Sequence, residues 1–114
     1  MIDFESRKTE NGTLVIQAIG RLDNDTNQYF FDCVKDEIES GNAKIVINLQ
    51  ELGYISSMGL GSLVRASSRA AKAGGTIYLA NIESQVLDIL KLVSFDKIFS
   101  IYDTEEQAVE AIES

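Results

Sequence analysis

The sequence predicts a single α/β domain over residues 1–114, with a mixed, mostly parallel β-sheet of about five strands and four helices packed against it. The first two β-rich segments flank an Asn-Gly pair, which indicates an antiparallel hairpin. After the hairpin, segments with helical periodicity alternate with short β-rich segments, as in sheets built from right-handed crossovers. The 114 residues, 45% of them hydrophobic, suffice for one core but not for two.

The chain opens with two strands that we expect to pair. Ile2–Lys8 and Thr13–Ile19 are β-rich or alternate between polar and apolar residues, and Glu10-Asn11-Gly12 separates them. Asn-Gly favours the left-handed backbone conformations that tight hairpin turns require. The turn therefore predicts direct pairing of the two segments.

An amphipathic helix is predicted next. The polar stretch Asp23-Asn24-Asp25-Thr26 offers several side chains that can cap the start of a helix. Phe30, Val34 and Ile38 then recur at helical spacing, and Ser40-Gly41 ends the pattern. We expect the apolar stripe of this helix to face the sheet.

The middle of the chain predicts a central strand, a helix and another strand. Lys44–Leu49 is short, β-branched and nearly all apolar, which is typical of a strand covered on both faces. A helix follows Ser56-Ser57 and ends at Gly74-Gly75, and Thr76–Ala80 is the next strand. The predicted buried stripe of this helix is Leu60, Leu63, Val64, Ser67 and Ala71.

The last third predicts two more helices around a weak strand. Lys97–Ile101 is the weak strand. Thr104-Glu105-Glu106-Gln107 has the pattern of a capping box and begins a final helix that runs through Ile112. The helix before the weak strand is marked by Val86, Ile89, Leu90 and Val93.

Composition excludes several classes of function. Lysine and arginine total 10 against 18 acidic residues, the formal net charge is −8, and no basic run is long enough to follow a phosphate backbone. We therefore expect no nucleic acid partner. The chain has no histidine, which excludes His-based metal sites and Ser-His or Cys-His catalysis. We expect a protein that is not an enzyme and that holds neither a metal nor a cofactor.

The single cysteine and the lack of long apolar segments bear on location. Cys33 lies among apolar residues and is expected to be a buried thiol in a reducing compartment. No segment approaches the roughly 18 apolar residues of a membrane span, and the first residues lack the apolar stretch of a signal peptide. We expect a cytoplasmic protein with no membrane association.

The segment Leu49–Gly61 is the candidate functional region. It comprises a strand, a loop with a small apolar step, and a helix start that contains Ser56, Ser57, Gly59 and Gly61. The N-terminus of a helix has unsatisfied N–H groups and favours anionic oxygen by about 0.3–1 kcal/mol at exposed sites. A serine at this place is therefore well suited to carry a phosphate.

Two interpretations of this turn are open from the residues alone. Each glycine lowers helix propensity by roughly 1 kcal/mol relative to alanine, which is easier to understand if another backbone approaches closely. Alternatively, Ser56 or Ser57 is only an N-cap and the glycines only allow the strand and helix to pack. In the same way, Met58 can project into a partner groove or fill the core.

Several motifs in the sequence resemble the STAS family, and specifically the bacterial anti-sigma factor antagonists. The central one is Ser56-Ser57-Met58-Gly59-Leu60-Gly61, which is similar to the family's Asp-Ser-Ser/Thr/Ala-Gly-Leu-Gly. Gly20-Arg21-Leu22-Asp23 resembles the family's Gly-Glu-Leu-Asp. The resemblance spans nearly the whole chain and also includes Lys44–Leu52, Gly74-Gly75 and Leu90–Phe99.

The resemblance implies a phosphorylation site and a partner. In the family, the serine after the motif's Asp is phosphorylated by a serine protein kinase that is also the anti-sigma factor, and matching the glycines places this acceptor at Ser57. A phosphatase is implied as well. Ser56 departs from the pattern, because it stands where the family has Asp, so any help from that carboxylate in phosphoryl transfer or partner contact is missing.

The resemblance also implies that the loop before the first helix lies beside residues 56–61, which we call the serine turn. Capping by Asp23 or Asn24 is an alternative role for that loop, and both roles can coexist. We expect the protein to be a monomer when free. The predicted partner-binding residues are Asp23, Asn24, Asp25, Thr26, Ser56, Ser57, Met58, Gly59, Leu60 and Gly61.

The function predicted in this way is that of an anti-sigma factor antagonist that acts by partner switching. The unphosphorylated protein binds the kinase, and phosphorylation at Ser57 releases it. One alternative is a constitutive STAS scaffold of a sensory or transport complex that is never phosphorylated. Another is a small phosphotransfer or nucleotide-binding protein, but both glycine-rich nucleotide motifs are absent, and Asn48 stands where a receiver domain needs Asp.

Overall fold

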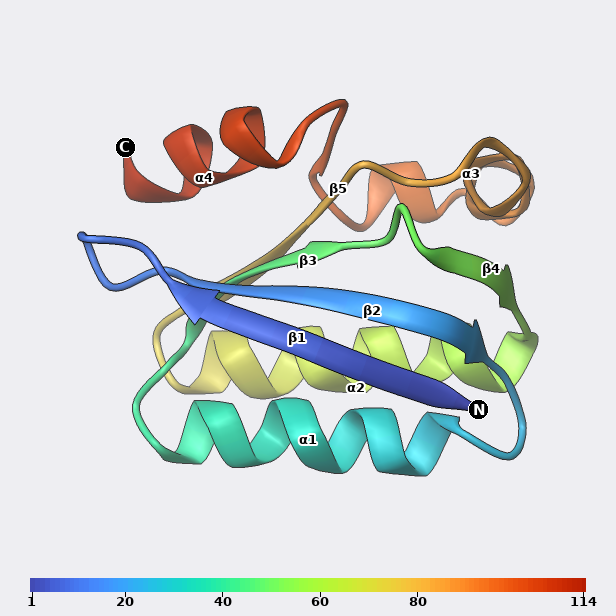
Figure 1. Cartoon of the computed structure of the whole chain (residues 1–114), viewed down its shortest axis with the longest axis horizontal. Coiled ribbons are helices and arrows are strands. Elements are labelled where there is room, and N and C mark those ends of the chain that lie inside the picture. The colour runs from blue at the N-terminus through green and yellow to red at the C-terminus, as the bar shows by residue number, and fades with distance from the viewer.

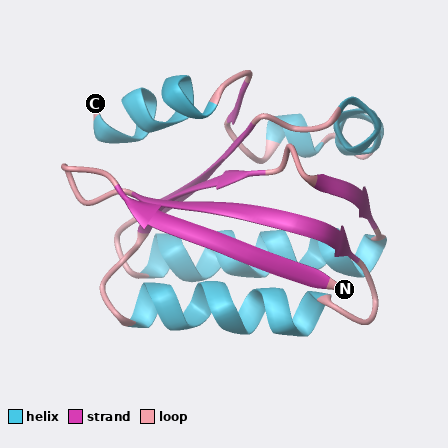
Figure 2. Cartoon of the chain, viewed as in Figure 1, coloured by secondary structure: helices cyan, strands magenta, loops and turns pink.

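The computed structural model describes residues 1–114 and contains a six-stranded sheet with four α-helices (Figures 1 and 2). The strands are β1 (Ile2–Lys8), β2 (Leu14–Leu22), β3 (Lys44–Asn48), β4 (Leu52–Ile55), β5 (Thr76–Ala80) and β6 (Ile101–Tyr102). The helices are α1 (Asn27–Glu39), α2 (Ser57–Lys72), α3 (Ser84–Leu92) and α4 (Glu105–Glu113), with a 3-10 turn, η1 (Phe95–Lys97), after α3.

The sheet is mixed and mostly parallel, which confirms the predicted fold class. Its order is β1-β2-β3-β5-β6, and β4 pairs with β2 beyond the end of β3. Only β1 is antiparallel, and it pairs with β2 across the predicted hairpin turn, where Gly12 has a φ of +88°. The hairpin is confirmed, with the left-handed conformation at Gly12 and not at Asn11.

The helices cover the two faces of the sheet unequally. In Figure 1, α1 and α2 lie side by side beneath the sheet, α4 lies above it, and α3 sits beside β4. The larger core contains 23 buried residues and includes the apolar stripe of α1, whereas the smaller core has five. Most of the apolar packing therefore lies on the α1 and α2 side of the sheet. The five residues of the smaller core are Val15, Val46, Ala80, Ala108 and Ile112.

Two strand predictions need correction. β4 was expected to be a loop: its ends, Leu52 and Ile55, are buried and its middle is exposed, so it shows neither alternation nor a continuous apolar run. It brings the number of strands from about five to six. Lys97–Ile101 is not a strand, because Phe95 and Phe99 are both buried, with ring centroids 5.7 Å apart, and the chain between them is a tight turn. Only Ile101 and Tyr102 join the sheet.

Two burial predictions also need correction. In α2, Val64 and Ala71 are exposed, and the buried stripe continues through Leu63, Ala66 and Ala70 instead. Cys33 is half-buried rather than buried. The pKa of its thiol is raised, chiefly by partial desolvation, so the thiolate is disfavoured. None of the helices combines the length and apolar character required to cross a membrane.

Candidate functional site

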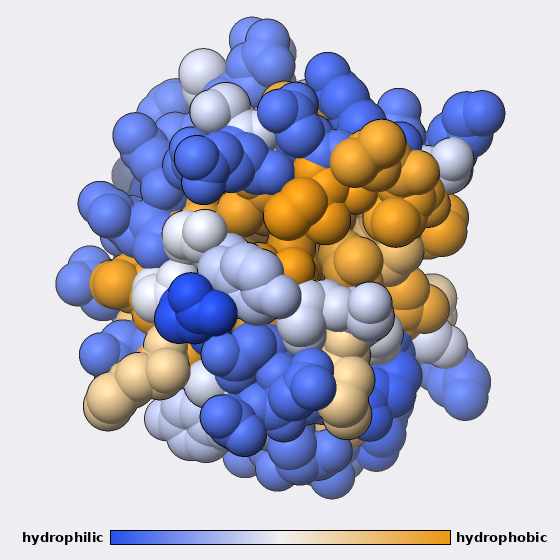
Figure 3. Space-filling view, turned by 90° about the vertical axis from the view of Figure 1, so that its right-hand side faces the viewer, coloured by the Kyte–Doolittle hydropathy of each residue, from blue (hydrophilic) through white to orange (hydrophobic).

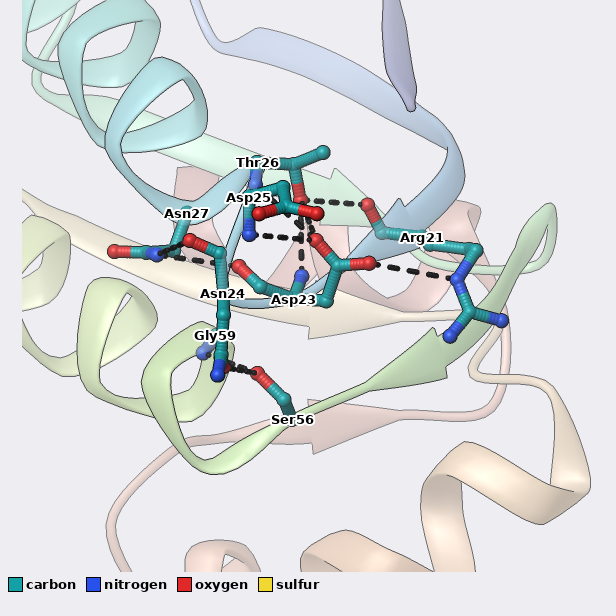
Figure 4. Close-up of polar contacts among 8 residues, drawn as sticks. All are labelled: Arg21, Asp23, Asn24, Asp25, Thr26, Asn27, Ser56 and Gly59. Atoms are coloured by element: carbon teal, nitrogen blue, oxygen red, sulfur yellow. Dashed lines mark hydrogen bonds and ion pairs between the residues drawn. The ribbon is translucent and has the colours of Figure 1, made fainter.

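Strand β4 places the serine turn beside the loop that precedes α1. β4 runs parallel to β2, with Arg21 opposite Tyr54 and Leu22 opposite Ile55. The backbone N–H of Ser56 then donates to the carbonyl of Leu22 at 2.9 Å. Because parallel strands end at the same edge of a sheet, the two segments that follow β2 and β4 leave it together (Figure 4). This is how the structure brings the predicted residues 23–26 and 56–58 together.

Ser56 caps α2 and ties it to the neighbouring loop. Its backbone is extended, and its Oγ accepts a hydrogen bond from the N–H of Gly59 at 3.1 Å, as an N-cap does. The same hydroxyl donates to Oδ1 of Asn24 at 3.1 Å. Figure 4 shows the dashed lines that run from the Ser56 hydroxyl toward Gly59 and Asn24. The hydroxyl of Ser56 is therefore engaged both as an acceptor and as a donor.

Ser57 and Met58 differ from Ser56 in being exposed. Ser57 is the first residue of α2, and its hydroxyl has no hydrogen-bond partner within the chain. Met58 has 53% of its surface exposed, so it does not fill the core. The first turn of α2 thus presents a free hydroxyl and a flexible apolar side chain to the surroundings.

The loop before α1 is held by Asp23 and Thr26. Oδ1 of Asp23 accepts from the N–H of Asp25 at 3.0 Å, and from the N–H and hydroxyl of Thr26 at 3.2 Å each. Desolvation is the largest single contribution and opposes ionisation of Asp23, but the hydrogen bonds together outweigh it and hold the pKa of Asp23 below the usual value. The carboxylate therefore stays charged and fixes the shape of the loop.

Asp23 caps the turn directly before α1, through the N–H groups of Asp25 and Thr26, and does not occupy the N-cap position of the helix itself. The N-cap of α1 is Thr26, whose side chain makes no capping bond. Its buried hydroxyl accepts from the N–H of Asp23 at 2.9 Å, and its single proton is shared between the carbonyl of Arg21 at 2.8 Å and Oδ1 of Asp23 at 3.2 Å. Thr26 thus faces inward, whereas Asn24 and Asp25 remain exposed.

The remaining predicted residues, Gly59, Leu60 and Gly61, lie in different environments. A Cβ on Gly59 would collide with the carbonyl oxygen of Leu22, so the close approach of α2 to β2 requires glycine there. Leu60 is buried in the larger core. Gly61 is exposed, and a Cβ on it would meet nothing within 4 Å. Packing within the chain therefore explains Gly59 but not Gly61.

A surface hollow of about 470 Å³ joins the two segments. Two of its residues, Arg21 and Tyr54, are not among the site residues predicted from the sequence. The guanidinium carbon of Arg21 lies 4.4 Å from the centre of the Tyr54 ring, and Nε of Arg21 lies 3.4 Å from Oδ2 of Asp23. Their contact follows from the β2–β4 register, which could not be predicted while β4 was taken for a loop. The lining comprises Arg21, Asp23, Asn24, Asp25, Tyr54, Ser56, Ser57 and Met58.

An apolar patch lies outside this hollow. Leu92 and Val93 at the end of α3 and Ile98 after η1 are exposed. Figure 3 shows apolar atoms gathered on the upper part of the side of the molecule that carries α3 and β4. None of the three residues lines the hollow at the start of α2.

Comparison with known families identifies the domain. The model of the STAS domain matches residues 6–108. The chain belongs to the STAS domain family. This confirms the resemblance that the serine turn and the Gly-Arg-Leu-Asp segment indicated.

Relatives of this STAS domain include named anti-sigma factor antagonists. The anti-sigma F factor antagonist of Paenibacillus polymyxa is 26% identical over 103 residues, which cover 90% of this chain and 88% of that protein. A STAS-domain containing protein of Pseudomonas aeruginosa is 31% identical over 88 residues, which cover 77% of this chain and 86% of that protein.

Solved structures share the fold of this STAS domain. The crystal structure of a Thermotoga maritima protein, named as a candidate anti-sigma factor antagonist, superposes with a TM-score of 0.89 at 26% identity, covering 97% of this chain and 95% of that one. The anti-sigma factor antagonist SpoIIAA in its unphosphorylated form gives a TM-score of 0.73 at 20% identity, with coverage of 98% and 99%.

Proposed function

We propose that this STAS domain is an anti-sigma factor antagonist that acts by partner switching. The unphosphorylated protein binds a serine protein kinase that also serves as an anti-sigma factor, and phosphorylation of Ser57 releases it. A phosphatase then restores the unphosphorylated form. In this role the protein acts in the cytoplasm as a binding module, monomeric when free, and not as an enzyme.

The observation that carries the proposal is the difference between the two serines. The hydroxyl of Ser57 is exposed and unpartnered at the rim of the hollow, whereas the hydroxyl of Ser56 accepts from Gly59 and donates to Asn24. A kinase can therefore reach Ser57 Oγ without breaking the cap of α2. In the transfer, Oγ forms a bond to the γ-phosphorus of ATP, the bond to the ADP oxygen breaks, and the partner kinase takes the hydroxyl proton.

Electrostatics explains why the phosphate would release the partner. A phosphoserine adds a charge of about −1.5 to −2 together with three bulky oxygens. The hollow contains the carboxylates of Asp23 and Asp25 and one guanidinium, that of Arg21, so phosphorylation makes a site with excess negative charge still more negative. The added charge and volume would disrupt a close, partly dry interface, and a loss of only about 1.4 kcal/mol weakens binding tenfold.

The first test is the mass of the protein purified from its native cells under several growth conditions. We expect a fraction that carries one added phosphoryl group, and peptide mapping should locate it at Ser57. A Ser57→Ala variant should lose the modified fraction, and a Ser56→Ala variant, as the matched control, should keep it. Phosphate at Ser56 instead of Ser57 would contradict the assignment.

The second test uses partner capture from the same cells. The unmodified protein should retain a serine kinase, Ser57→Ala should retain it equally, and Ser57→Asp should retain at least tenfold less because of its charge. Equal capture by all three would contradict partner switching.

Ser56 also favours a second candidate, the constitutive scaffold. Because Ser56 stands where the family motif has Asp, the residue next to Ser57 has no carboxylate that can assist phosphoryl transfer. Absence of phosphate under every condition, together with equal capture by the Ser57→Asp variant, would support this scaffold function.

A further inference from the structure

We propose that Arg21 is the phosphate-positioning residue of this domain: when Ser57 carries a phosphoryl group, the guanidinium of Arg21 binds it across the hollow. The inference rests on the proposed function, because it concerns the phosphorylated form of Ser57. It assigns a role to a residue that neither the motif around Ser57 nor the loop after β2 includes.

The position of Arg21 is set by the sheet. It lies near the end of β2, opposite Tyr54 of β4, and both residues line the hollow that Ser57 borders. The guanidinium lies over the face of the Tyr54 ring at 4.4 Å, and this cation–π contact steadies a side chain that is otherwise 57% exposed. The guanidinium is thus held beside the serine turn and does not move freely in solvent.

Arg21 has hydrogen-bonding capacity to spare. Its only side-chain contact with a polar group is the pair between Nε and Oδ2 of Asp23, at a long 3.4 Å. A guanidinium carries five N–H donors, and those on the two terminal nitrogens have no partner in the chain. These donors form the fork that binds phosphate oxygens in pairs.

Arg21 is the one cationic residue in the lining of the hollow, so it is the residue that can bind the phosphate. The charged residues in the lining are Arg21, Asp23 and Asp25. Asp23 is largely committed to the loop through Oδ1, so Arg21 can leave its long contact without undoing the turn. Relative to the family pattern, Arg21 replaces Glu and Ser56 replaces Asp, and both differences make the site more favourable for an anion.

The test is a phosphorus NMR titration of the full chain with phosphoserine incorporated genetically at position 57. This preparation needs no kinase. We expect Arg21→Gln to raise the second pKa of the phosphate, because the dianion loses its cationic partner. The dianion should then bind a proton about threefold more tightly. Arg21→Lys keeps the charge but lacks the fork of donors, so the second pKa of its phosphate should lie between the values of the unsubstituted protein and of Arg21→Gln.

Arg65→Gln is the matched control. Arg65 also lies over an aromatic ring, that of Phe31 at 4.9 Å, and also contacts a polar side chain, Oδ1 of Asn27 at 3.3 Å, but it does not line the hollow. Its replacement should leave the phosphate titration unchanged. Amide spectra recorded at each pH verify that all variants remain folded.

A direct readout comes from the side chain of Arg21. Its N–H signals should shift and become protected from exchange in the phosphorylated form but not in the unmodified form. An Arg21→Gln titration identical to that of Arg65→Gln, or an unshifted Arg21 N–H signal on phosphorylation, would overturn the inference. Absence of phosphate at Ser57 in native cells would overturn only the proposed function, because the incorporated phosphoserine tests the contact by itself.

Discussion

At the residue scale, the two glycines of the serine turn have different surroundings: Gly59 packs against the rest of the chain, and Gly61 does not. Gly59 faces the carbonyl of Leu22 and has no room for a side chain, whereas Gly61 faces open space. A glycine inside a helix costs roughly 1 kcal/mol relative to alanine. Because nothing within the chain requires that cost at Gly61, we infer that the backbone of the partner comes close there.

We predict opposite effects of alanine at these two positions. Gly61→Ala should raise the free energy of unfolding by up to about 1 kcal/mol, because it only improves helix propensity. Gly59→Ala should lower it by roughly 1–3 kcal/mol through overpacking against β2. Urea denaturation measures both, and partner capture should be weaker for Gly61→Ala despite its greater stability. A destabilised Gly61→Ala protein would show that the chain itself needs this glycine.

The sequence predicted part of the site at this scale. The choice of Ser57 as the phosphorylation site came from the register of the glycine motif, needs no structure, and stays a prediction. The separate roles of Ser56 and Ser57 were not predictable, because both are suitable N-caps and only the backbone geometry decides which one is used. Arg21 was missed because its neighbour Tyr54 is brought to it by strand pairing and not by proximity in the chain.

At the element scale, the C-terminal helix α4 is fastened to the β1–β2 turn by one carboxylate. Glu113 accepts hydrogen bonds from the hydroxyls of Thr9 at 2.6 Å and Thr13 at 2.7 Å, and from the amide of Asn11 at 3.1 Å. The hydrogen bonds from Thr9, Thr13 and Asn11, in that order of importance, hold the pKa of Glu113 below its usual value. The charged form of Glu113 therefore stabilises the folded chain.

This pKa predicts how stability depends on pH. A lowered carboxyl pKa gives a contribution that is complete above the pKa of the unfolded chain and disappears as the pH falls through the pKa of the folded chain. Glu113→Gln should therefore be less stable than the natural protein at pH 7, and the difference should shrink on acidification. Urea denaturation at pH 7 and at an acidic pH measures this difference in stability, with Glu110→Gln in the same helix as the control. A difference that grows in acid would contradict this role.

Elements with a strong local signal were predictable, and elements defined by pairing were not. The Asn-Gly turn, the stripe Phe30, Val34 and Ile38, and the cap at Thr104, which accepts from the N–H of Gln107 at 3.1 Å, all appear as expected. β4 has only four residues and no period of its own, so its strand conformation depends on pairing with β2. For the same reason β6 was placed too early in the chain.

At the scale of the whole molecule, the two faces of the sheet are stabilised unequally. The 23-residue cluster includes side chains of α1 and α2, whereas the cluster that holds α4 has five residues, two of them from α4 itself. The free energy of local opening follows the apolar contacts that an element makes. We therefore expect α4 to open more readily than α2 while the rest of the chain stays folded.

Native-state hydrogen exchange tests this expectation. Amides within α4 should exchange faster than those in the middle of α2, and amides of the central strand β3 should be among the slowest. Ile112→Ala should accelerate exchange in α4 more than in α2. Equal protection of α2 and α4 would show that the chain opens only as a unit.

Residues 1 and 114 lie at positions suited to a fluorescent label and to a surface tether. The carbonyl of Met1 accepts the N–H of Arg21 at 3.0 Å, so the first residue lies beside the backbone of a residue that lines the hollow, whereas Ser114 lies at the opposite end of the molecule (Figure 1). A dye attached at Met1 should therefore report the arrival of a partner. A tether attached at Ser114 would hold the protein on a sensor surface with the hollow facing away from it.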